Sequence, residues 1–220
     1  MGSKQFARLP RHVGFIPDGN RRWAEQRGLP RSEGYAAGIE PGLLLLDECA
    51  RLGIAEVSIY GFTQENTRRP KEQTQAFRAA CVEFALRAAA RGVALRVLGD
   101  ATSPVFPPEL IPYAERRVGP GPLRVNLLVN YGWAWDLENA LRHGASAGRR
   151  DVMQCLASAD ASRLDLVVRW GGRCRLSGFL PVQSVYADLY VVDALWPDFQ
   201  IEQFHEALRW HARQDVTLGG

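Results

Sequence analysis

The chain has 220 residues, 46% of them hydrophobic, and a formal net charge of +3 at pH 7. This length and apolar content predict a single domain over residues 1–220 with a full hydrophobic core. Arginine carries almost all of the positive charge, because lysine occurs only at positions 4 and 71. The sequence has no basic stripe with interleaved aromatic side chains, which argues against a nucleic-acid-binding protein.

The predicted elements alternate between strands and helices along the chain. In chain order they are a strand at residues 13–16, a helix at 38–52, a strand at 56–62, a helix at 72–91, a strand at 94–98, a helix at 107–117, a strand at 123–129, a helix at 134–142, a strand at 164–168, an apolar segment at 184–190 and a helix at 204–211. Residues 144–160, rich in Ala, Ser, Gly and Arg, are expected to be flexible. The alternation predicts an α/β fold with a central, mostly parallel sheet flanked by helices.

The cysteines and the apolar runs indicate which kinds of site and which cellular location to expect. Four cysteines are scattered without a CxxC pair, so neither a zinc site nor a disulfide framework is predicted. The longest apolar runs are far shorter than 18 residues, and no signal peptide is recognisable. We therefore expect a cytoplasmic protein with no transmembrane segment.

The first predicted strand runs directly into a cluster of turn-forming residues that includes Asp18, and Arg21 and Arg22 follow at the start of a helix-like stretch. In α/β sheets, ligands bind where a strand ends and a helix begins, and the free N–H groups there attract anions. A carboxylate among phosphate-binding arginines indicates a phosphate with bound Mg²⁺. The alternative is an ordinary turn in which Asp18 caps the helix.

Polar side chains follow the other predicted strands as well. They are Thr63, Glu65, Asn66 and Arg69 after the second strand, Asn130 after the fourth, and Arg169, Arg173, Arg175 and Ser177 after the fifth. Because the carboxyl ends of parallel strands share one edge of a sheet, these groups can converge. This convergence favours an anion-binding site over a simple capped turn.

Five motifs resemble those of the cis-prenyltransferases, the undecaprenyl diphosphate synthase family. They are Asp18-Gly-Asn-Arg-Arg-Trp23, Tyr60-Gly-Phe-Thr-Gln-Glu-Asn66 with Arg69-Pro70, Asn130-Tyr-Gly132, Asp165-Leu-Val-Val-Arg169 with Arg175-Leu-Ser177, and Leu195-Trp-Pro-Asp-Phe199. The similarity runs from about residue 12 to residue 208 in the correct order. It implies the fold of that family, prenyl diphosphate substrates, Mg²⁺ as cofactor and a homodimer.

The resemblance also implies roles for individual residues. Asp18 would bind Mg²⁺ and support departure of an allylic diphosphate. Asn66, together with Asp18, would assist removal of a proton from the second substrate. Thr63 stands at the neighbouring catalytic position, where the family usually has a serine. The residues matching the site of the first diphosphate are Gly19, Asn20, Arg21, Arg22 and Arg31. Trp23 would be a further substrate-binding residue, and Arg69 matches a substrate-binding arginine near Asn66. Those matching the site of the second diphosphate are Arg169, Arg175 and Ser177. Asp188 stands where the family has a second Mg²⁺-binding carboxylate, a glutamate.

Several positions depart from the family pattern, and we expect them to set the product. Arg173 replaces an acid beside the second diphosphate, Tyr35 replaces a histidine, and Thr67 replaces an aromatic residue. Trp170 replaces a small residue, and the helix at residues 72–91 is about one turn shorter than in long-chain members. The apolar face of that helix, with Phe77, Cys81, Phe84 and Leu86, lines either the prenyl pocket or the core. Trp133 and Trp135 are expected to pack rather than to contact substrate.

Three functions follow from this pattern. The first is a synthase that joins two C5 diphosphates head-to-middle into a short, irregular, lavandulyl-type product, open or cyclised. The second is a regular short-chain synthase that uses isopentenyl diphosphate. The third is a non-catalytic partner subunit, against which the retained Asp18, Asn66 and Arg169 argue.

Overall fold

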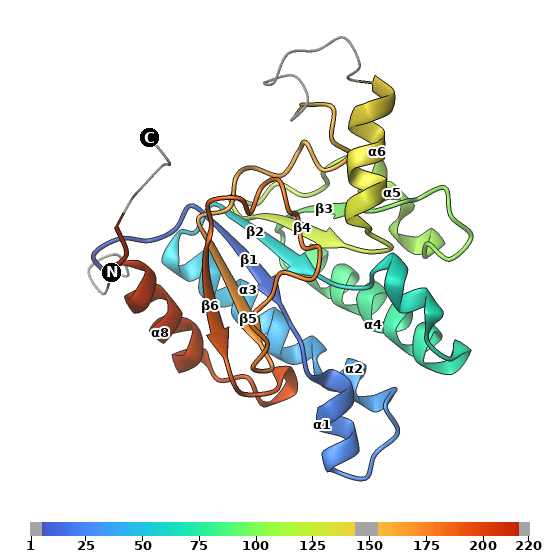
Figure 1. The fold of residues 1–220 in the computed structure, drawn as a ribbon, viewed down its shortest axis with the longest axis horizontal. Helices are drawn as coiled ribbons and strands as arrows, with labels where there is room; N and C mark the ends of the chain where they lie inside the picture. The colour runs from blue at the N-terminus through green and yellow to red at the C-terminus, as the bar shows by residue number, and fades with distance from the viewer. Residues whose placement is uncertain (1–5, 144–153, 216–220) are drawn as a thin grey trace.

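The computed structural model describes residues 6–143 and 154–215. Six strands form one sheet in the order β3-β4-β2-β1-β5-β6, and every neighbouring pair is parallel. Their bounds are β1 His12–Ile16, β2 Glu56–Tyr60, β3 Ala94–Leu98, β4 Arg124–Leu128, β5 Leu166–Trp170 and β6 Asp188–Val192. The predicted α/β fold with a parallel central sheet flanked by helices is confirmed (Figure 1).

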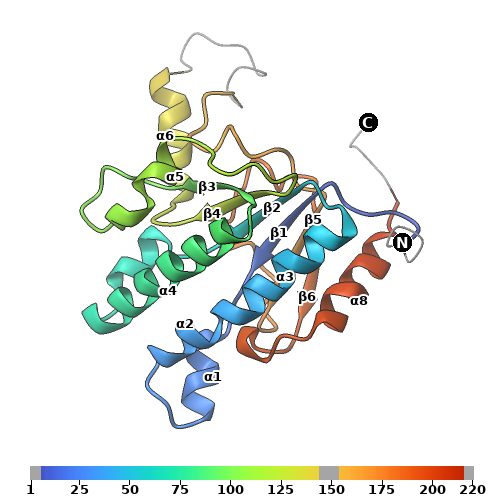
Figure 2. The ribbon, with the colours of Figure 1, turned by 180° about the vertical axis from the view of Figure 1, so that it is seen from behind.

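Helices cover both faces of the sheet. The α-helices are α1 Asn20–Gln26, α2 Glu33–Ala37, α3 Ile39–Leu52, α4 Lys71–Ala90, α5 Ile111–Glu115, α6 Trp133–His143 and α8 Ile201–His211, and the 3₁₀ helices are η1 Gln64–Arg68, η2 Pro108–Leu110 and η3 Trp196–Asp198. Figure 2 shows α3, α4 and α8 on one face, with α1 and α2 beyond the end of β1. None of the helices in the described part of the chain has the length and apolarity to cross a bilayer.

The core consists of two layers, one on each face of the sheet. The larger layer packs the leucines of α3 and the aromatic side chains of α8 against the strands, and the smaller one surrounds Phe179 on the opposite face. Strand β1 is buried along its whole length, as expected for a parallel strand covered on both sides. The loops at its carboxyl end are therefore held by a rigid base.

Two predicted segments differ clearly from the observed elements. The predicted helix at residues 107–117 is split into η2 and α5, because Pro112 has no backbone N–H and can occupy only the first turn of a helix. The predicted apolar segment at 184–190 overlaps β6, which begins only at Asp188. Most of the segment 144–160 that was expected to be flexible lies outside the described residues.

Candidate active site

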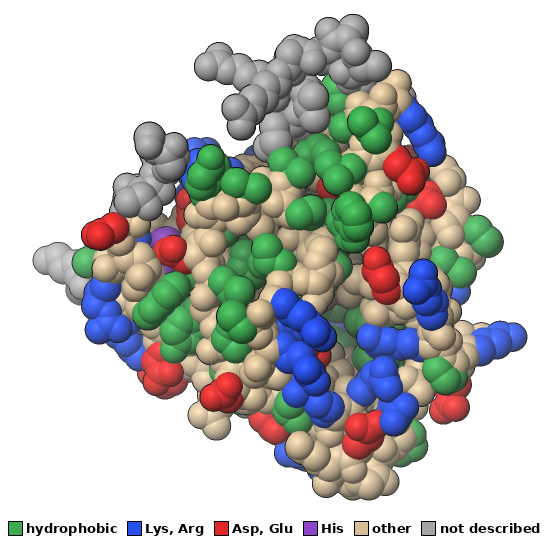
Figure 3. Space-filling view, viewed as in Figure 1, with side chains coloured by type: hydrophobic (Ala, Val, Ile, Leu, Met, Phe, Trp, Pro, Cys, Tyr) green, Lys and Arg blue, Asp and Glu red, His purple; other side chains and the backbone are tan. Residues whose placement is uncertain are grey.

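A pocket of about 540 Å³ lies at the carboxyl ends of β1, β2 and β5. Basic side chains gather around it on the face shown in Figure 3. Its wall contains Ile16, Pro17, Asp18, Gly19, Asn20, Arg21, Arg22, Glu25, Tyr35, Tyr60, Gly61, Thr63, Glu65, Asn66, Arg69, Phe77, Trp133, Arg169, Arg173, Arg175 and Ser177. Most of the residues predicted from the sequence therefore converge in one cavity.

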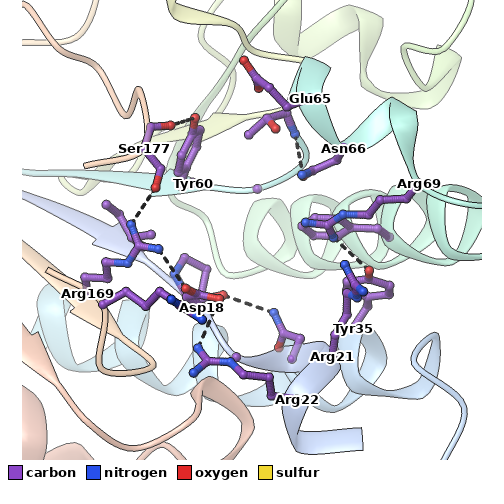
Figure 4. Close-up of a pocket in the computed structure, with 18 of the residues that line it drawn as sticks. Asp18, Arg21, Arg22, Tyr35, Tyr60, Glu65, Asn66, Arg69, Arg169 and Ser177 are labelled. Atoms are coloured by element: carbon purple, nitrogen blue, oxygen red, sulfur yellow. Dashed lines mark hydrogen bonds and ion pairs between the residues drawn. The ribbon is translucent and has the colours of Figure 1, made fainter. Parts of the chain in front are cut away.

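The carboxylate of Asp18 is the centre of this site. The chain turns sharply after β1, and α1 begins immediately after Gly19, whose φ of 112° favours glycine. No side chain caps α1, so the alternative of a simple capped turn is not what the structure shows. Instead Asp18 accepts a hydrogen bond from Arg169 at 2.8 Å and lies 3.6 Å from Arg22 (Figure 4).

One group of basic side chains comes from α1 and from the segment after η1. Arg21 and Arg22 lie on the first turn of α1, and Arg69 donates a hydrogen bond of 2.9 Å to the Tyr35 hydroxyl. The Tyr35 ring stacks on Phe77 with centroids 4.5 Å apart and an interplanar angle of 6°. This arginine group therefore borders an aromatic wall.

The second basic group follows β5. The Arg169 guanidinium, on a residue only 3% exposed, donates to the Ser177 hydroxyl at 2.9 Å and to the carbonyl of Arg175. Tyr60 donates a hydrogen bond of 2.8 Å to the Ser177 carbonyl, and burial raises the pKa of Tyr60, so that it remains a donor. Arg173 and Arg175 lie in the same wall. This side of the pocket is arranged to receive an anion.

The two groups meet at Gly171. Arg22 donates a hydrogen bond of 2.9 Å to its carbonyl, and a Cβ at this position would lie 2.5 Å from the Arg22 guanidinium. With φ of 89°, only glycine fits here without strain. The site is therefore one continuous surface with two arginine-rich halves.

Thr63 and Asn66 form a capping box at the start of η1. The Asn66 side-chain oxygen accepts the Thr63 backbone N–H at 3.1 Å, and the Thr63 side chain accepts the Asn66 backbone N–H. An amide oxygen has two lone pairs, so Asn66 retains acceptor capacity. Glu65, which was noted after the second strand but given no role, also lines the pocket.

A smaller apolar cavity of about 60 Å³ adjoins the charged pocket. Tyr35 and Phe77 line both cavities, while Cys81 and Phe84 line only the apolar one. Leu86 is 46% exposed on the outer side of α4 and belongs to neither. Of the predicted apolar face of α4, Phe77, Cys81 and Phe84 therefore line the apolar cavity next to the charged pocket, and Leu86 does not.

Asp188 does not lie near Asp18 within one chain. In the sheet register, Asp188 pairs with Leu166, and Leu166 pairs with Val13 near the amino-terminal end of β1. Asp188 is therefore about 10 Å along the strand direction from the carboxyl end of β1. Its carboxylate accepts a hydrogen bond of 2.7 Å from His211. Within one chain, Asp188 therefore lies apart from the pocket that contains Asp18.

Other predicted residues also lie outside the pocket. Trp23 donates to Asp198 at 2.7 Å, Arg31 pairs with Glu25, and the Thr67 hydroxyl donates to the Gln64 carbonyl at 2.6 Å. These side chains stabilise the loops around the site rather than its wall.

Trp170 was expected, from its departure from the family pattern, to help set the product, but it lines neither the charged pocket nor the apolar cavity. Its side chain is fully buried, packs against Trp196 and Phe199, and donates to Gln203 at 2.9 Å. Trp133, expected to pack, is instead 48% exposed in the pocket wall.

The site fits a divalent cation that is shared with a ligand. Across residues 6–143 and 154–215, no three His, Cys, Asp or Glu side chains form a ready metal cage. Mg²⁺ characteristically uses one or two carboxylates together with substrate phosphates and waters. Asp18, one-third exposed in the pocket, provides one such carboxylate beside the arginines.

Comparisons with known proteins agree with this geometry. A family model described as putative undecaprenyl diphosphate synthase matches residues 16–219. The isoprenyl transferase of Nitrosomonas europaea is 33% identical over 99% of this chain and 88% of its own length. The ditrans,polycis-undecaprenyl-diphosphate synthase ((2E,6E)-farnesyl-diphosphate specific) of Pseudomonas putida is 36% identical over 96% of this chain and 91% of its own.

A solved structure shows the same fold. The lavandulyl diphosphate synthase from Lavandula x intermedia, in complex with dimethylallyl diphosphate, superposes with a TM-score of 0.83. The match covers 96% of this chain and 99% of that one, at 24% sequence identity.

Proposed function

The chain belongs to the undecaprenyl diphosphate synthase family of prenyltransferases, and from that premise we propose that its pocket couples dimethylallyl diphosphate to a second C5 diphosphate. One observation carries this proposal. The Asp18 carboxylate lies between Arg22 of one arginine group and Arg169 of the other, so a single acid borders both anion sites. Two diphosphates need two such groups, and the pocket contains two.

The first step breaks the allylic C–O bond, and the electron pair leaves with the diphosphate. Arg21, Arg22 and Arg69 would absorb the negative charge that develops on the leaving group. Asp18 would hold Mg²⁺, whose charge neutralises the same leaving group. The arginines are already in place around the pocket, so little reorganisation is needed when the bond breaks.

The second step forms a carbon–carbon bond between the allylic cation and the double bond of the other substrate. Arg169, Arg175 and Ser177 would hold that substrate by its diphosphate. The coupled cation then loses a proton to a basic oxygen of the departed diphosphate. Asn66 and Asp18, which both line the pocket, would assist this transfer.

The apolar cavity supports a short product. Its volume of about 60 Å³ is well below the ~150 Å³ of an engineered apolar cavity that binds benzene. The stacked Tyr35 and Phe77 rings stand where the charged pocket meets this cavity. A prenyl chain of many isoprene units would have no room behind them.

Arg173 supports an irregular coupling. It adds a positive charge beside the second anion group, at a position where the family pattern has an acid. A changed second site fits a changed second substrate, so we propose that both substrates are dimethylallyl diphosphate. The product would then be a lavandulyl-type C10 diphosphate, open or cyclised.

The regular head-to-tail reaction with isopentenyl diphosphate is the second candidate, favoured by the names of the bacterial relatives. Incubation of the protein and Mg²⁺ with dimethylallyl diphosphate alone separates the two. A coupled product without isopentenyl diphosphate supports the irregular reaction. A strict requirement for isopentenyl diphosphate supports the regular one, and no coupled product under either condition contradicts both.

A further inference from the structure

Trp133, the first residue of α6, presents an uncovered aromatic surface to the pocket. Among the residues that the structure describes, the indole of each of the other five tryptophans has a hydrogen bond or an aromatic neighbour, and the indole of Trp133 has neither. Its side chain is nevertheless 48% exposed beside charged groups. A large apolar ring in such a place is available to the hydrocarbon part of a ligand.

The backbone beneath Trp133 is firmly held. Tyr131 forms a β-bridge with Thr63, and its hydroxyl donates to Asp136 at 2.8 Å. A Cβ on Gly132 would lie 2.2 Å from the side-chain oxygen of Gln64, so the segment passes very close to η1. The backbone from which the indole projects is therefore fixed before any ligand arrives.

The indole also contacts the loop that carries the second arginine group. A Cβ built on Gly178 would lie 2.8 Å from Cδ1 of Trp133, and Gly178 has φ of 80°. The preceding residue, Ser177, accepts the hydrogen bond from Arg169. A diphosphate bound at Arg169 and Ser177 would thus place its hydrocarbon within reach of Trp133.

We infer that Trp133 covers the hydrocarbon of the second C5 diphosphate and is a specificity-determining residue for that substrate. The inference rests on the proposed function and adds to it the place of the second hydrocarbon. Tyr35 and Phe77 already provide the aromatic wall on the side of the first arginine group. The second group, rich in charge, has no other large uncovered ring in the described part of the pocket wall.

Calorimetric titration tests this inference. Dimethylallyl thiolodiphosphate, a slowly ionising analogue of the proposed second substrate, and inorganic pyrophosphate are titrated, with Mg²⁺ present, into the wild type, Trp133→Ala, Trp133→Phe and the control Leu141→Ala, a 74%-exposed position on the same helix. Trp133→Ala should weaken binding of one equivalent of the analogue about tenfold, as loss of apolar contact does. Pyrophosphate affinity, the Trp133→Phe variant and the control should each stay within about threefold of wild type.

The contrary outcomes are equally specific. An equal loss for pyrophosphate and the dimethylallyl analogue in Trp133→Ala would show that the indole supports the loop or the diphosphate, and the inference would be wrong. No loss for either ligand would overturn it too. Failure of the proposed function can be told apart from failure of this inference. A wild-type protein that binds C5 diphosphates but couples none of them contradicts the proposed function. The affinities of the Trp133 variants still decide the role of Trp133 in that case.

Discussion

Asp18 and Arg169 are 151 residues apart in the chain, yet the Arg169 guanidinium donates a hydrogen bond of 2.8 Å to the Asp18 carboxylate. Arg169 is almost completely buried, so its charge needs an acidic partner in the absence of ligand. Asp18 is one-third exposed and also faces Arg22. The pair joins the loop after β1 to the end of β5 and connects the two halves of the site.

Asp18→Asn should abolish most of the activity while the protein remains folded. The amide still accepts the hydrogen bond from Arg169 but cannot provide the charge that Mg²⁺ needs. We expect kcat to fall by about 10³ or more, comparable to the loss of an essential electrostatic group. Steady-state kinetics and circular dichroism check this, with Asp47→Asn, an exposed carboxylate on α3, as control. A variant with more than a tenth of wild-type kcat contradicts the role of Asp18.

Phe77→Ala should lengthen the product. The substitution removes one ring of the Tyr35 stack and opens the small apolar cavity towards Cys81 and Phe84. With isopentenyl diphosphate and a longer allylic starter supplied, we expect products extended by at least one C5 unit, measured by mass spectrometry. Leu86→Ala, on the outer side of the same helix, should leave the product length unchanged. Unchanged products in Phe77→Ala would show that the stack does not limit length.

Arg173→Glu should shift the choice of second substrate. The substitution restores the acid of the family pattern and removes a positive charge from the pocket wall. A charge interaction of about 1 kcal/mol changes the ratio of isopentenyl to dimethylallyl incorporation by roughly fivefold. Competition between the two diphosphates, read by product mass, measures this ratio. Arg209→Glu is the control, because it makes the same charge change at an exposed position of α8 away from the pocket. An equal shift of the incorporation ratio in Arg209→Glu would contradict the prediction.

His12 should remain neutral below the pH at which an unfolded histidine takes up a proton. Its ring is fully buried and is hydrogen-bonded at 2.9 Å to the Ser58 hydroxyl, and burial lowers its pKa more than Glu56 and Asp165 raise it. The unfolded chain then binds a proton that the folded chain does not, so the stabilising effect is complete above about pH 6.5 and is lost as the pH falls below it.

Two measurements check the prediction for His12. NMR titration of the imidazole should give a pKa below 6.5, and urea unfolding should show lower stability at pH 5.5 than at pH 7.5. His12→Gln should reduce this pH dependence. A measured pKa above 6.5 would show that the neighbouring carboxylates dominate over burial.

The alternation of strands and helices was enough to predict where the charged residues gather. Asp18, Thr63 and Arg169 each follow or end a buried strand, and parallel strands bring such positions to one edge. The role of Trp170 was misjudged because successive residues of a strand face opposite sides of the sheet. Trp170 shares its side with the helix-facing core, while its neighbour Arg169 faces the pocket.

Two other features depend on tertiary contacts that sequence spacing does not reveal. Trp133 faces the pocket because the turn at Gly132 docks against η1, a contact between distant segments. Asp188 begins the edge strand β6, so its distance from Asp18 follows from the register with β5 rather than from its motif. For both residues, the sequence pointed to the position, and tertiary packing determined which groups lie near the side chain.

The length of the product formed with all substrates present tests the central proposal most directly. The protein is incubated with Mg²⁺, dimethylallyl diphosphate, isopentenyl diphosphate and farnesyl diphosphate together, and the dephosphorylated products are identified by mass spectrometry and NMR. The small cavity behind Tyr35 and Phe77 predicts C10 alcohols as the main products. Long polyprenols built on the farnesyl group would contradict the account.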